Sequence, residues 1–298
     1  CYRDLGKTLF DIIEKYNDIF FMFYTNGTLF TEELAKRIKI TGNCVACISV
    51  EGYELETDMR RGTGTHKKIL NTFKLLRSHG IPFTISVTAT EKNKSILLDE
   101  KFYKYYFDTL GASFMWQFQF MPIGRGTEVF DLMPSPETRV QLFRFWEKLL
   151  EEKKYCVVDF WNSGMLTNGC VAFGRGRGYV YIDWNGKIAP CVFVPYYVET
   201  VYEMYASGRK LGDILKHPFF KNGRKWQQEY GLNHGTCNQN GIMPCPIRDH
   251  FFNFKHNICT SDIKGSDKTV EHILENEWYE KRMQEYDAEL MELTEKIW

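Results

Sequence analysis

The sequence lacks an excess of charge of either sign and lacks long apolar runs. Its 298 residues contain 38 Lys and Arg against 38 Asp and Glu, so the formal net charge is zero. A protein that binds nucleic acid or acidic membranes generally needs a basic excess, so we expect neither nucleic acid nor a membrane as a partner. The apolar runs extend over only a few residues, which predicts no membrane-spanning helix, and no signal peptide or internal repeat is recognisable.

Cysteine and apolar residues, in contrast, are plentiful. Apolar side chains make up 44% of the chain, and a length of 298 residues allows one large domain or two ordinary ones. Nine cysteines without a secretory signal indicate a reducing compartment, so we expect a cytoplasmic protein whose cysteines bind metal before they form disulfides. Because the sequence begins with Cys1 and enters a helical pattern almost at once, we also expect a processed or fragmentary chain.

Strand-length apolar runs alternate with helical patterns over the first half of the chain. Four alternations predict an α/β fold with a parallel sheet, either open or curved into part of a barrel. In such sheets, chemistry takes place at the carboxyl ends of the strands. The predicted strands cover residues 19–25, 44–50, 83–90 and 113–122, and their carboxyl-end segments are 25–27, 49–51, 88–90 and 122–124.

The second half of the chain carries four cysteines at turn-like positions. Cys170 and Cys191 have the spacing C-x15-G-x4-C, in which the glycine belongs to an Asn-Gly pair at residues 185–186 that predicts a β-hairpin turn. Cys237 and Cys245 follow in a second stretch rich in Gly and Pro. Thiolates presented from several turns suit an iron–sulfur cluster or zinc. The alternative is four unrelated buried cysteines, but their position beside Gly and Pro favours metal ligands.

Composition divides the chain into three parts. Residues 1–154 carry the alternating pattern, and residues 155–258 lose it and gain Gly, Pro and aromatic residues. This change predicts a small hairpin-based domain held by its metal site. Residues 259–298 regain helical spacing and predict a C-terminal helical tail.

Several stretches of the first part resemble the core of radical S-adenosylmethionine (radical SAM) enzymes. They are YTNGTLFTEELAKRI at 24–38, ISVEG at 48–52 and MRRGTGTHKKILNTFKLLRSHGIPFTISVTATEKN at 59–93. The cysteine-bearing half resembles the SPASM-type auxiliary-cluster domain appended to many of these enzymes. The spacing C-x15-G-x4-C, MPIGRG at 121–126 and PCPIRDH at 244–250 carry this second likeness. Together, the two likenesses cover roughly residues 8–250.

The resemblance implies a partial (β/α)6 radical SAM barrel followed by a SPASM-like domain. It also implies an oxidoreductase or maturase that binds S-adenosylmethionine (SAM) at a [4Fe-4S] cluster and releases a 5′-deoxyadenosyl radical, which abstracts hydrogen from the substrate. The family commonly modifies peptides or proteins, so a peptide or protein substrate is implied, as is an external electron donor such as flavodoxin or ferredoxin. No general base or other catalytic side chain is identified by the sequence.

The sequence departs from the family pattern at the radical cluster. The motif C-x3-C-x2-C, which holds that cluster in the family, is absent, and so is the glycine-rich motif that follows the second strand. Cys44 and Cys47 are a close pair, but they lie on a predicted buried strand, where positions three apart face opposite sides. We interpret both as core residues. We therefore expect the chain to lack the first strand, the first helix and the second strand of the barrel, and to be inactive by itself.

The resemblance also assigns candidate SAM-binding residues at the strand ends: Asn26, Gly27, Ser49, Glu51 and Arg61. A guanidinium suits the methionine carboxylate because its planar fork donates two hydrogen bonds. Other interpretations stay open for this set, since Glu51 could be a solvated loop carboxylate and Arg60 could take the place of Arg61.

Two further polar features have both a structural and a functional interpretation. Gln117 and Gln119 alternate with aromatic residues on one strand, where they could line the substrate site or form structural hydrogen bonds. Arg125 lies in a Gly-Arg-Gly turn and could belong to the surface or to a site.

The four cysteines at 170, 191, 237 and 245 suffice for at most one auxiliary cluster. By resemblance, they are the ligands of one [4Fe-4S] cluster. Cys156 and Cys259 are left over, and His234 or His250 could replace a missing thiolate. A second hypothesis is a zinc-stapled binding module on an α/β scaffold, and a third is a degenerate family member that keeps only substrate binding. Iron with acid-labile sulfide would support the enzyme, whereas stoichiometric zinc would support the binding module.

Overall fold

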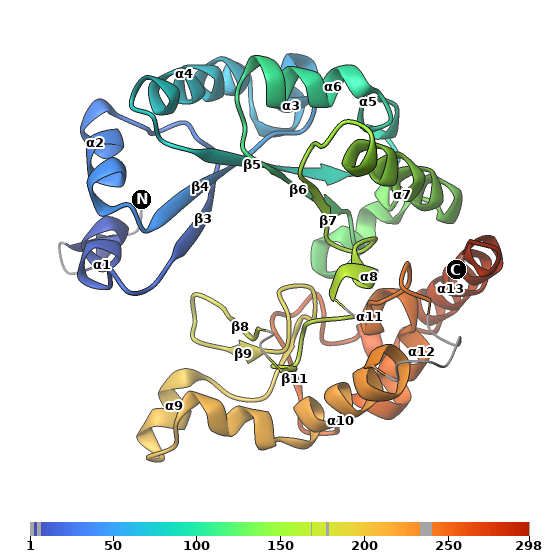
Figure 1. Cartoon of the computed structure of the whole chain (residues 1–298). Coiled ribbons are helices and arrows are strands. Elements are labelled where there is room, and N and C mark those ends of the chain that lie inside the picture. The colour runs from blue at the N-terminus through green and yellow to red at the C-terminus, as the bar shows by residue number, and fades with distance from the viewer. Residues whose placement is uncertain (1–2, 5–6, 168, 177–178, 233–239, 298) are drawn as a thin grey trace. The chain divides into compact units, whose positions relative to one another are not determined.

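The chain forms two compact units in a computed structural model (Figure 1). The structure describes residues 3–4, 7–167, 169–176, 179–232 and 240–297. One unit, here called the sheet unit, comprises residues 1–119 and 141–160, and the other, the cysteine unit, comprises residues 120–140 and 161–298. Because a compact unit need not be a separately folding domain, the domain boundaries predicted at residues 154 and 258 stay a prediction.

The sheet unit is built on a five-stranded parallel sheet. Its strands follow one another in chain order, so each crossover returns to the next neighbour. Figure 1 shows the helices of this unit gathered on one side of the sheet. The predicted α/β fold with a partial barrel is therefore confirmed. The strands are β3 (Phe21–Thr25), β4 (Cys44–Ser49), β5 (Phe83–Ala89), β6 (Met115–Gln119) and β7 (Val157–Asp159).

Helices separate the strands of this sheet. They are α1 (Leu9–Lys15), α2 (Glu32–Thr41), α3 (Glu54–Arg61), α4 (Thr65–Ser78), α5 (Lys94–Leu97), α6 (Glu100–Lys104) with a π-helical extension (Tyr105–Thr109), and α7 (Pro136–Glu151), which begins in the cysteine unit. A two-residue pair, β1 (Arg3–Asp4) and β2 (Lys7–Thr8), precedes them.

Local signals explain where the helices begin and end. The Thr31 hydroxyl accepts a hydrogen bond from the Leu34 amide at the start of α2, and Gly42 ends that helix with a φ of 65°. Phe73 of α4 is buried against the sheet and stacks on Phe83, with ring centroids 4.6 Å apart. Ile69, Phe73 and Leu76, which are spaced along one side of α4, are all buried.

The cysteine unit contains no large sheet among its described residues. Its strands come in two-residue antiparallel pairs, β8 (Tyr181–Ile182) with β9 (Ile188–Ala189) and β10 (Tyr196–Tyr197) with β11 (Lys264–Gly265). The Asn-Gly pair forms the predicted hairpin turn between β8 and β9, and Gly186 has a φ of 79°. A side chain at Gly186 would lie 2.7 Å from the Tyr202 ring, so both its φ and its packing require glycine.

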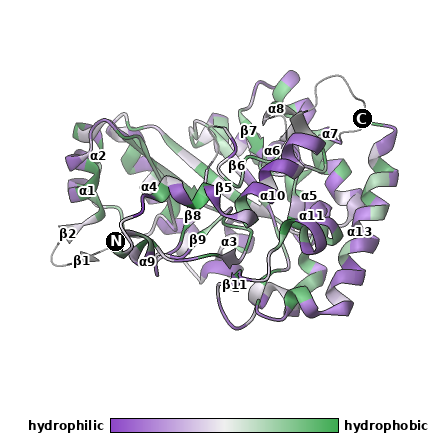
Figure 2. Cartoon of the chain, turned by 90° about the horizontal axis from the view of Figure 1, so that it is seen from below, coloured by the Kyte–Doolittle hydropathy of each residue, from purple (hydrophilic) through white to green (hydrophobic). Residues whose placement is uncertain are grey.

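Helices and aromatic rings form the core of the cysteine unit. Phe173, Phe219 and Phe220 pack edge to face, and Phe254 packs on Phe219. Figure 2 shows hydrophobic and hydrophilic stretches alternating along α13. The helices are α8 (Gly164–Thr167), α9 (Val201–Ala206), α10 (Pro218–Gln227), α11 (Pro246–Asp249), α12 (Phe251–Asn253) and α13 (Glu277–Glu295), with π-helical turns at Gln228–Leu232 and Phe254–Ile258 and 3-10 segments at Gly124–Leu132, Leu211–Lys216 and Ile273–Glu275.

Among the helices that the structure describes, none is both long enough and apolar enough to cross a bilayer.

Candidate functional site

The carboxyl end of β3 is a tight turn held by hydrogen bonds. The Gly27 amide donates to the Thr25 hydroxyl at 3.1 Å, and the Thr72 hydroxyl donates to the Gly27 carbonyl at 2.6 Å. Gly27 has a φ of 70°, and a Cβ there would lie 2.8 Å from a methyl group of Ile48. Gly27 therefore brings β3 and β4 close together at their ends. Its neighbour Asn26 is exposed and accepts hydrogen bonds from Thr28.

The carboxyl end of β4 carries a buried carboxylate that contacts two arginines. Glu51 is 3% exposed. Arg61 donates to Glu51 Oε1 from Nε at 2.9 Å and from Nη2 at 2.5 Å, and Arg60 donates to Oε2. Burial rules out the interpretation of Glu51 as a solvated loop carboxylate. The group of two guanidinium ions and one carboxylate carries one positive charge in excess, which suits an anionic ligand.

Asparagine and threonine side chains brace this end of the sheet. Asn93 Nδ2 donates to the Glu51 carbonyl at 3.2 Å and to the Thr88 carbonyl at 3.0 Å, so it ties the ends of β4 and β5 together. The Glu51 amide donates to the Thr57 hydroxyl at 3.3 Å. The carboxyl ends of neighbouring strands are thus held in fixed positions, as a binding site requires.

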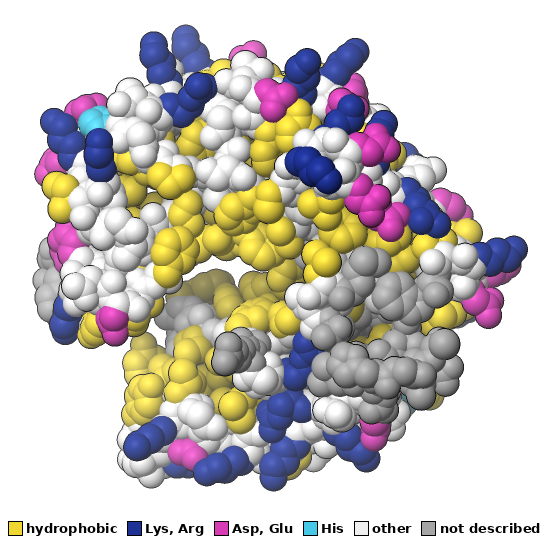
Figure 3. All heavy atoms as spheres, viewed as in Figure 1, with side chains coloured by type: hydrophobic (Ala, Val, Ile, Leu, Met, Phe, Trp, Pro, Cys, Tyr) yellow, Lys and Arg dark blue, Asp and Glu magenta, His cyan; other side chains and the backbone are white. Residues whose placement is uncertain are grey.

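The face of the sheet opposite the α4 side combines hydroxyl groups with aromatic rings. Ser49 of β4 and Ser86 of β5 lie side by side, with their hydroxyl oxygens 3.2 Å apart. Tyr24 of β3 reaches Phe118 of β6 across the two strands between them, with ring centroids 5.9 Å apart. Phe118 also packs on Phe160 at 5.5 Å. Figure 3 shows hydrophobic side chains gathered on the sheet unit away from the charged side chains of its outer helices.

Gln117 and Gln119 lie on the other face of the sheet and are buried. Both donate to the Asp159 carboxylate, at 2.8 Å and 3.1 Å, and Gln117 accepts a hydrogen bond from the Tyr103 hydroxyl at 3.1 Å. Their role is therefore structural. The alternation along 113–122 was recognisable in the sequence, but it does not say which set of residues faces the helices.

The cysteines of β4 do not fit an iron–sulfur cluster. Cys44 and Cys47 are both buried, and burial raises the pKa of each thiol. They are three positions apart on a strand and so face opposite sides of the sheet. The interpretation of both as core residues agrees with this placement. Cys156, one of the left-over cysteines, is exposed in the same unit.

Three of the four candidate ligands gather in the cysteine unit. Cys170 follows α8, Cys191 follows β9 and Cys245 immediately precedes α11. Each thiol lies near enough to another of the three to affect its ionisation, and burial raises the pKa of each to about 12. Ala172 donates its amide to Cys170 Sγ, as Phe193 does to Cys191 Sγ, both at 3.5 Å. Amide-to-sulfur hydrogen bonds of this kind stabilise thiolates, including those that ligate clusters.

These thiols do not form a closed ligand set in the structure. Within the described ranges, no group of three or more His, Cys, Asp or Glu side chains is arranged tightly enough to hold a metal ion. Cys237, the fourth candidate, and His234 lie outside the described residues. His250 is engaged elsewhere, since its Nε2 contacts the Met243 carbonyl at 2.9 Å and burial lowers its pKa. Cys259 is half-buried in the same unit.

A buried ion pair holds the turn that carries Cys245. Asp249 accepts a hydrogen bond from the Cys245 amide at 3.0 Å and pairs with Arg139, whose Nη2 lies 3.0 Å from Asp249 Oδ2. Both side chains are completely buried. Burial opposes the ionisation of Asp249, but Arg139 outweighs it and holds the pKa of that carboxyl below its usual range. Sequence reasoning missed this pair, and its one available signal was the presence of Asp249 within PCPIRDH.

A second buried arginine lies beside the same turn. The guanidinium of Arg248 lies between the rings of Trp161 and Tyr286, 5.2 Å and 5.6 Å from their centroids, and donates to the Tyr286 hydroxyl at 2.9 Å. Its Nε and Nη1 have no hydrogen-bond partner among the described residues. An incompletely paired cation in a protein interior is costly unless negative charge lies nearby. Asp249 and Asp287 supply that negative charge, since Arg248 lowers the pKa of Asp249 and opposes the rise in the pKa of Asp287. The fit to an iron–sulfur cluster therefore rests on the three neighbouring thiols and on the amides that donate to two of them.

Comparisons with known proteins point to one family for the sheet unit. The sequence profile of the radical SAM superfamily matches residues 1–95, which include β3, β4, β5 and their carboxyl ends. The chain belongs to the radical SAM superfamily. Enzymes of this superfamily use SAM and a [4Fe-4S] cluster.

Two curated relatives of this radical SAM chain share roughly a quarter to a third of its residues in the matched region. The AdoMet-dependent heme synthase of Methanosarcina barkeri is 27% identical over 201 residues, which cover 57% of this chain and 54% of the relative. The mycofactocin maturase MftC of Mycobacterium tuberculosis is 30% identical over 217 residues, which cover 69% of this chain and 52% of the relative. The radical SAM chain thus spans about half the length of these relatives.

A solved structure shows the same fold. Streptococcus suis SuiB, crystallised with the precursor peptide SuiA, matches with a TM-score of 0.56 at 11% identity, over 88% of this chain and 61% of SuiB. At this level of identity the similarity establishes the fold of the radical SAM chain and nothing further.

Proposed function

We propose that this chain acts in a radical SAM enzyme with a SPASM-like auxiliary domain, and that the enzyme abstracts hydrogen from a peptide or protein. When bound, SAM and its [4Fe-4S] cluster supply a 5′-deoxyadenosyl radical for that abstraction. The contribution of this chain is to bind and orient SAM at the strand ends of the sheet unit and to hold an auxiliary cluster in the cysteine unit. The names of the maturase MftC and of the SuiB–SuiA complex support a peptide substrate.

The strand ends of β3 and β4 supply the proposed SAM contacts. The candidate residues are Asn26, Gly27, Ser49, Glu51 and Arg61. The excess positive charge of Arg60 and Arg61 over Glu51 would attract the methionine carboxylate, and Glu51 would accept from the amino group or keep both guanidinium groups in place. Gly27 permits the ends of β3 and β4 to approach each other closely, because a side chain there would collide with Ile48 of β4.

The auxiliary cluster is assigned to Cys170, Cys191, Cys237 and Cys245. The observation that carries the assignment is that three of these cysteines come from separate turns and lie near enough to one another to affect each other's ionisation. Burial keeps these thiols protonated without metal, whereas metal binding would release their protons. The seven cysteines that the structure describes are all free thiols, which favours the predicted cytoplasmic location.

The radical cluster is not assigned to residues of this chain. The sequence has no C-x3-C-x2-C motif, and Cys44 and Cys47 are core residues of β4. We therefore propose that the chain by itself does not cleave SAM, and that its oxidoreductase chemistry needs cluster ligands that these residues do not supply. An external electron donor of the flavodoxin or ferredoxin type belongs to the same proposal.

The test is the metal content of the chain after anaerobic reconstitution with iron and sulfide. We expect about four iron and four sulfide ions per chain, the content of one [4Fe-4S] cluster. Cys191→Ser and Cys245→Ser should lose most of this iron, whereas Cys156→Ser, at an exposed position, should retain it. Stoichiometric zinc in protein purified anaerobically without added metal, together with failure to take up iron, would contradict the proposal and support a zinc-stapled binding module.

A further inference from the structure

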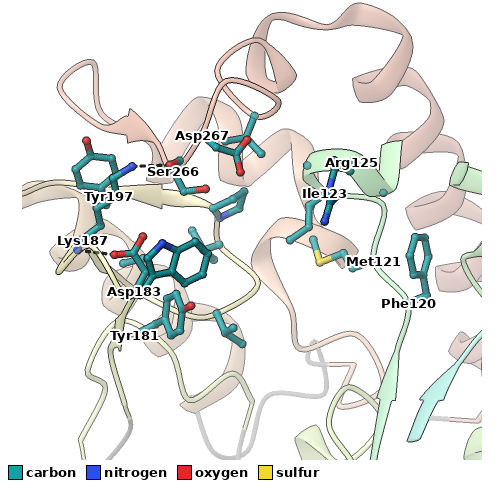
Figure 4. Close-up of a pocket in the computed structure, with 18 residues that line it drawn as sticks. Phe120, Met121, Ile123, Arg125, Tyr181, Asp183, Lys187, Tyr197, Ser266 and Asp267 are labelled. Atoms are coloured by element: carbon teal, nitrogen blue, oxygen red, sulfur yellow. Dashed lines mark hydrogen bonds between the residues drawn. The ribbon is translucent and has the colours of Figure 1, made fainter. Parts of the chain in front are cut away.

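A pocket of about 380 Å³ lies within the cysteine unit, and its lining contains none of the three gathered thiols, although Ala189 and Val192 lie on either side of Cys191 in the sequence. Two walls face each other in Figure 4: Tyr181, Asp183 and Lys187 come from the β8–β9 hairpin, and Met121, Ile123 and Arg125 come from the segment that ends in the Gly-Arg-Gly turn. Its volume falls within the range of roughly 300–1,000 Å³ that is typical of small-ligand sites. Neither the SAM contacts nor the auxiliary cluster uses these residues.

The hairpin wall is rigid and carries an exposed indole. The Asp183 carboxylate accepts from the amides of Asn185 and Lys187, both at 2.8 Å, and the Val201 amide donates to the Gly186 carbonyl at 2.8 Å. Trp184 lies on this tip and is 87% exposed. A large apolar side chain on a hydrogen-bonded hairpin at the rim of a pocket offers an extensive binding surface.

The opposite wall is also fixed by its backbone. The Ile123 amide donates to the Met121 carbonyl and the Gly126 amide to the Ile123 carbonyl, both at 2.9 Å. A side chain on Gly124 would lie 3.2 Å from the Thr269 hydroxyl, so this turn packs closely on a neighbouring segment. The buried residues of the lining, among them Met121, Ala189, Val194 and Val270, are apolar.

Three of the four charged side chains of the lining have hydrogen-bond partners within the cysteine unit. Lys187 donates to the Ser266 carbonyl at 2.5 Å and lies 4.8 Å from the Tyr197 ring centroid. Asp183 accepts the two hairpin amides, and Asp267 accepts from the amide and hydroxyl of Thr269. Arg125 has no hydrogen bond or ion pair with any described residue. The lining thus carries two cationic and two anionic side chains above an apolar floor, and among these four Arg125 is the one left free to pair with a ligand.

We propose that this pocket binds a peptide segment in which an acidic side chain lies next to a bulky apolar one. The acidic group pairs with the guanidinium of Arg125, and the apolar side chain lies between Trp184 and the floor of the pocket. That the ligand is a peptide rests on the proposed function, whereas the pairing of acidic with apolar chemistry rests on the lining itself. The pocket thus anchors a part of the substrate that does not react.

The test uses 19F NMR of the whole chain labelled with 5-fluorotryptophan, in which Trp184→Phe identifies the Trp184 resonance. The probes are the blocked dipeptides acetyl-Phe-Glu-amide and acetyl-Phe-Gln-amide, which differ by one charge. The glutamate peptide should shift the Trp184 resonance saturably and bind about fivefold more tightly than the glutamine peptide, as expected for a partly exposed ion pair. Acetyl-Ala-Glu-amide should bind more weakly because it lacks the apolar side chain.

A variant of Arg125 tests whether its positive charge causes the preference for the glutamate peptide. Arg125→Gln should bind both phenylalanine peptides with the affinity that the unaltered chain has for the glutamine peptide. The matched control Arg144→Gln, at another exposed arginine, should keep the preference for the glutamate peptide. Equal affinity for the two peptides in the unaltered chain, or an unshifted Trp184 resonance, would overturn the proposal. Because no step of the test involves SAM or iron, failure of the proposed catalytic function would leave this result unaffected.

Discussion

The two units of this chain are stabilised by different means. In the sheet unit, five parallel strands form continuous backbone ladders, and its buried carboxylate Asp159 is bound by neutral amides. In the cysteine unit, the strands are two residues long, and buried charged side chains link segments far apart in the sequence. Backbone ladders make the sheet unit largely independent of any single side chain. The cysteine unit depends on a few side chains and, in our proposal, on a metal cluster.

Among the predicted effects, the largest should come from removing one charge of the buried pair of Arg139 and Asp249, which destabilises the cysteine unit. Arg139→Met leaves the Asp249 carboxylate buried without its cation and should destabilise the cysteine unit by about 3–5 kcal/mol. Hydrogen exchange measured along a urea titration would show the loss in peptides from 240–297, with peptides from 83–119 unchanged.

Arg144→Met is the matched control, because Arg144 lies on the same helix but is exposed and forms an ion pair with Glu147 of that helix. It should change stability by less than about 0.5 kcal/mol. Equal effects of the two variants would show that the buried pair does not hold the unit together. The double variant Arg139→Met/Asp249→Leu should recover part of the loss, since it removes both buried charges.

A backbone change should have the second largest effect, this time in the sheet unit. Gly27→Ala combines a left-handed φ with a collision against Ile48, and should cost about 3 kcal/mol from strain and overpacking together. Gly42→Ala has nearly the same φ but open space around it, so it should cost only about 1 kcal/mol. Thermal unfolding of the two variants measures the difference, and equal losses would argue against close packing between the ends of β3 and β4.

The smallest predicted effect is a change in pH dependence within the cysteine unit. Burial and the nearby Asp249 raise the pKa of Asp287 to about 8, and Asp287 also faces Arg139 and Arg248. The folded state therefore holds a proton that the unfolded state releases near pH 4, so this group makes stability fall as pH rises from about 4 to about 8.

Asp287→Asn should remove that slope while keeping an acceptor for the Phe251 amide. Between pH 6 and pH 7, the unfolding free energy of the unaltered chain should fall by at most about 1.4 kcal/mol more than that of the variant, which is the value for one proton. Urea unfolding at both pH values measures it, and parallel pH profiles of the two proteins would mean that Asp287 is ionised in the folded state.

The sequence was sufficient for a parallel sheet and for the ends of four of its strands, because apolar runs and Gly turns are local signals. It missed the short fifth strand, β7. Residues 44–50 form a buried strand as their composition predicts, and Asn26, Ser49 and Glu51 follow or end strands as expected. The contacts of these residues were not predictable in the same way. The pairing of Glu51 with both arginines depends on the conformation of the loop and on α3, which the strand pattern does not determine.

Long-range side-chain networks lay beyond the sequence. Arg139 and Asp249 are 110 positions apart, and neither belongs to a pattern that predicts the other. The face taken by Gln117 and Gln119 was also undetermined, because a period of two gives the alternation without its direction. The cysteine spacing predicted a hairpin and a set of ligands. The hairpin is confirmed, and the ligand set stays a prediction because Cys237 lies outside the described residues.

The most direct test of the contrast between the units is hydrogen exchange of the anaerobically reconstituted chain before and after removal of its metal with a chelator. We predict that residues 161–176, 179–232 and 240–258 lose protection, while the strands β4, β5 and β6 exchange at unchanged rates. Unchanged protection of the cysteine unit, or equal losses in both units, would contradict the view that a metal cluster organises one unit and that the other folds without it.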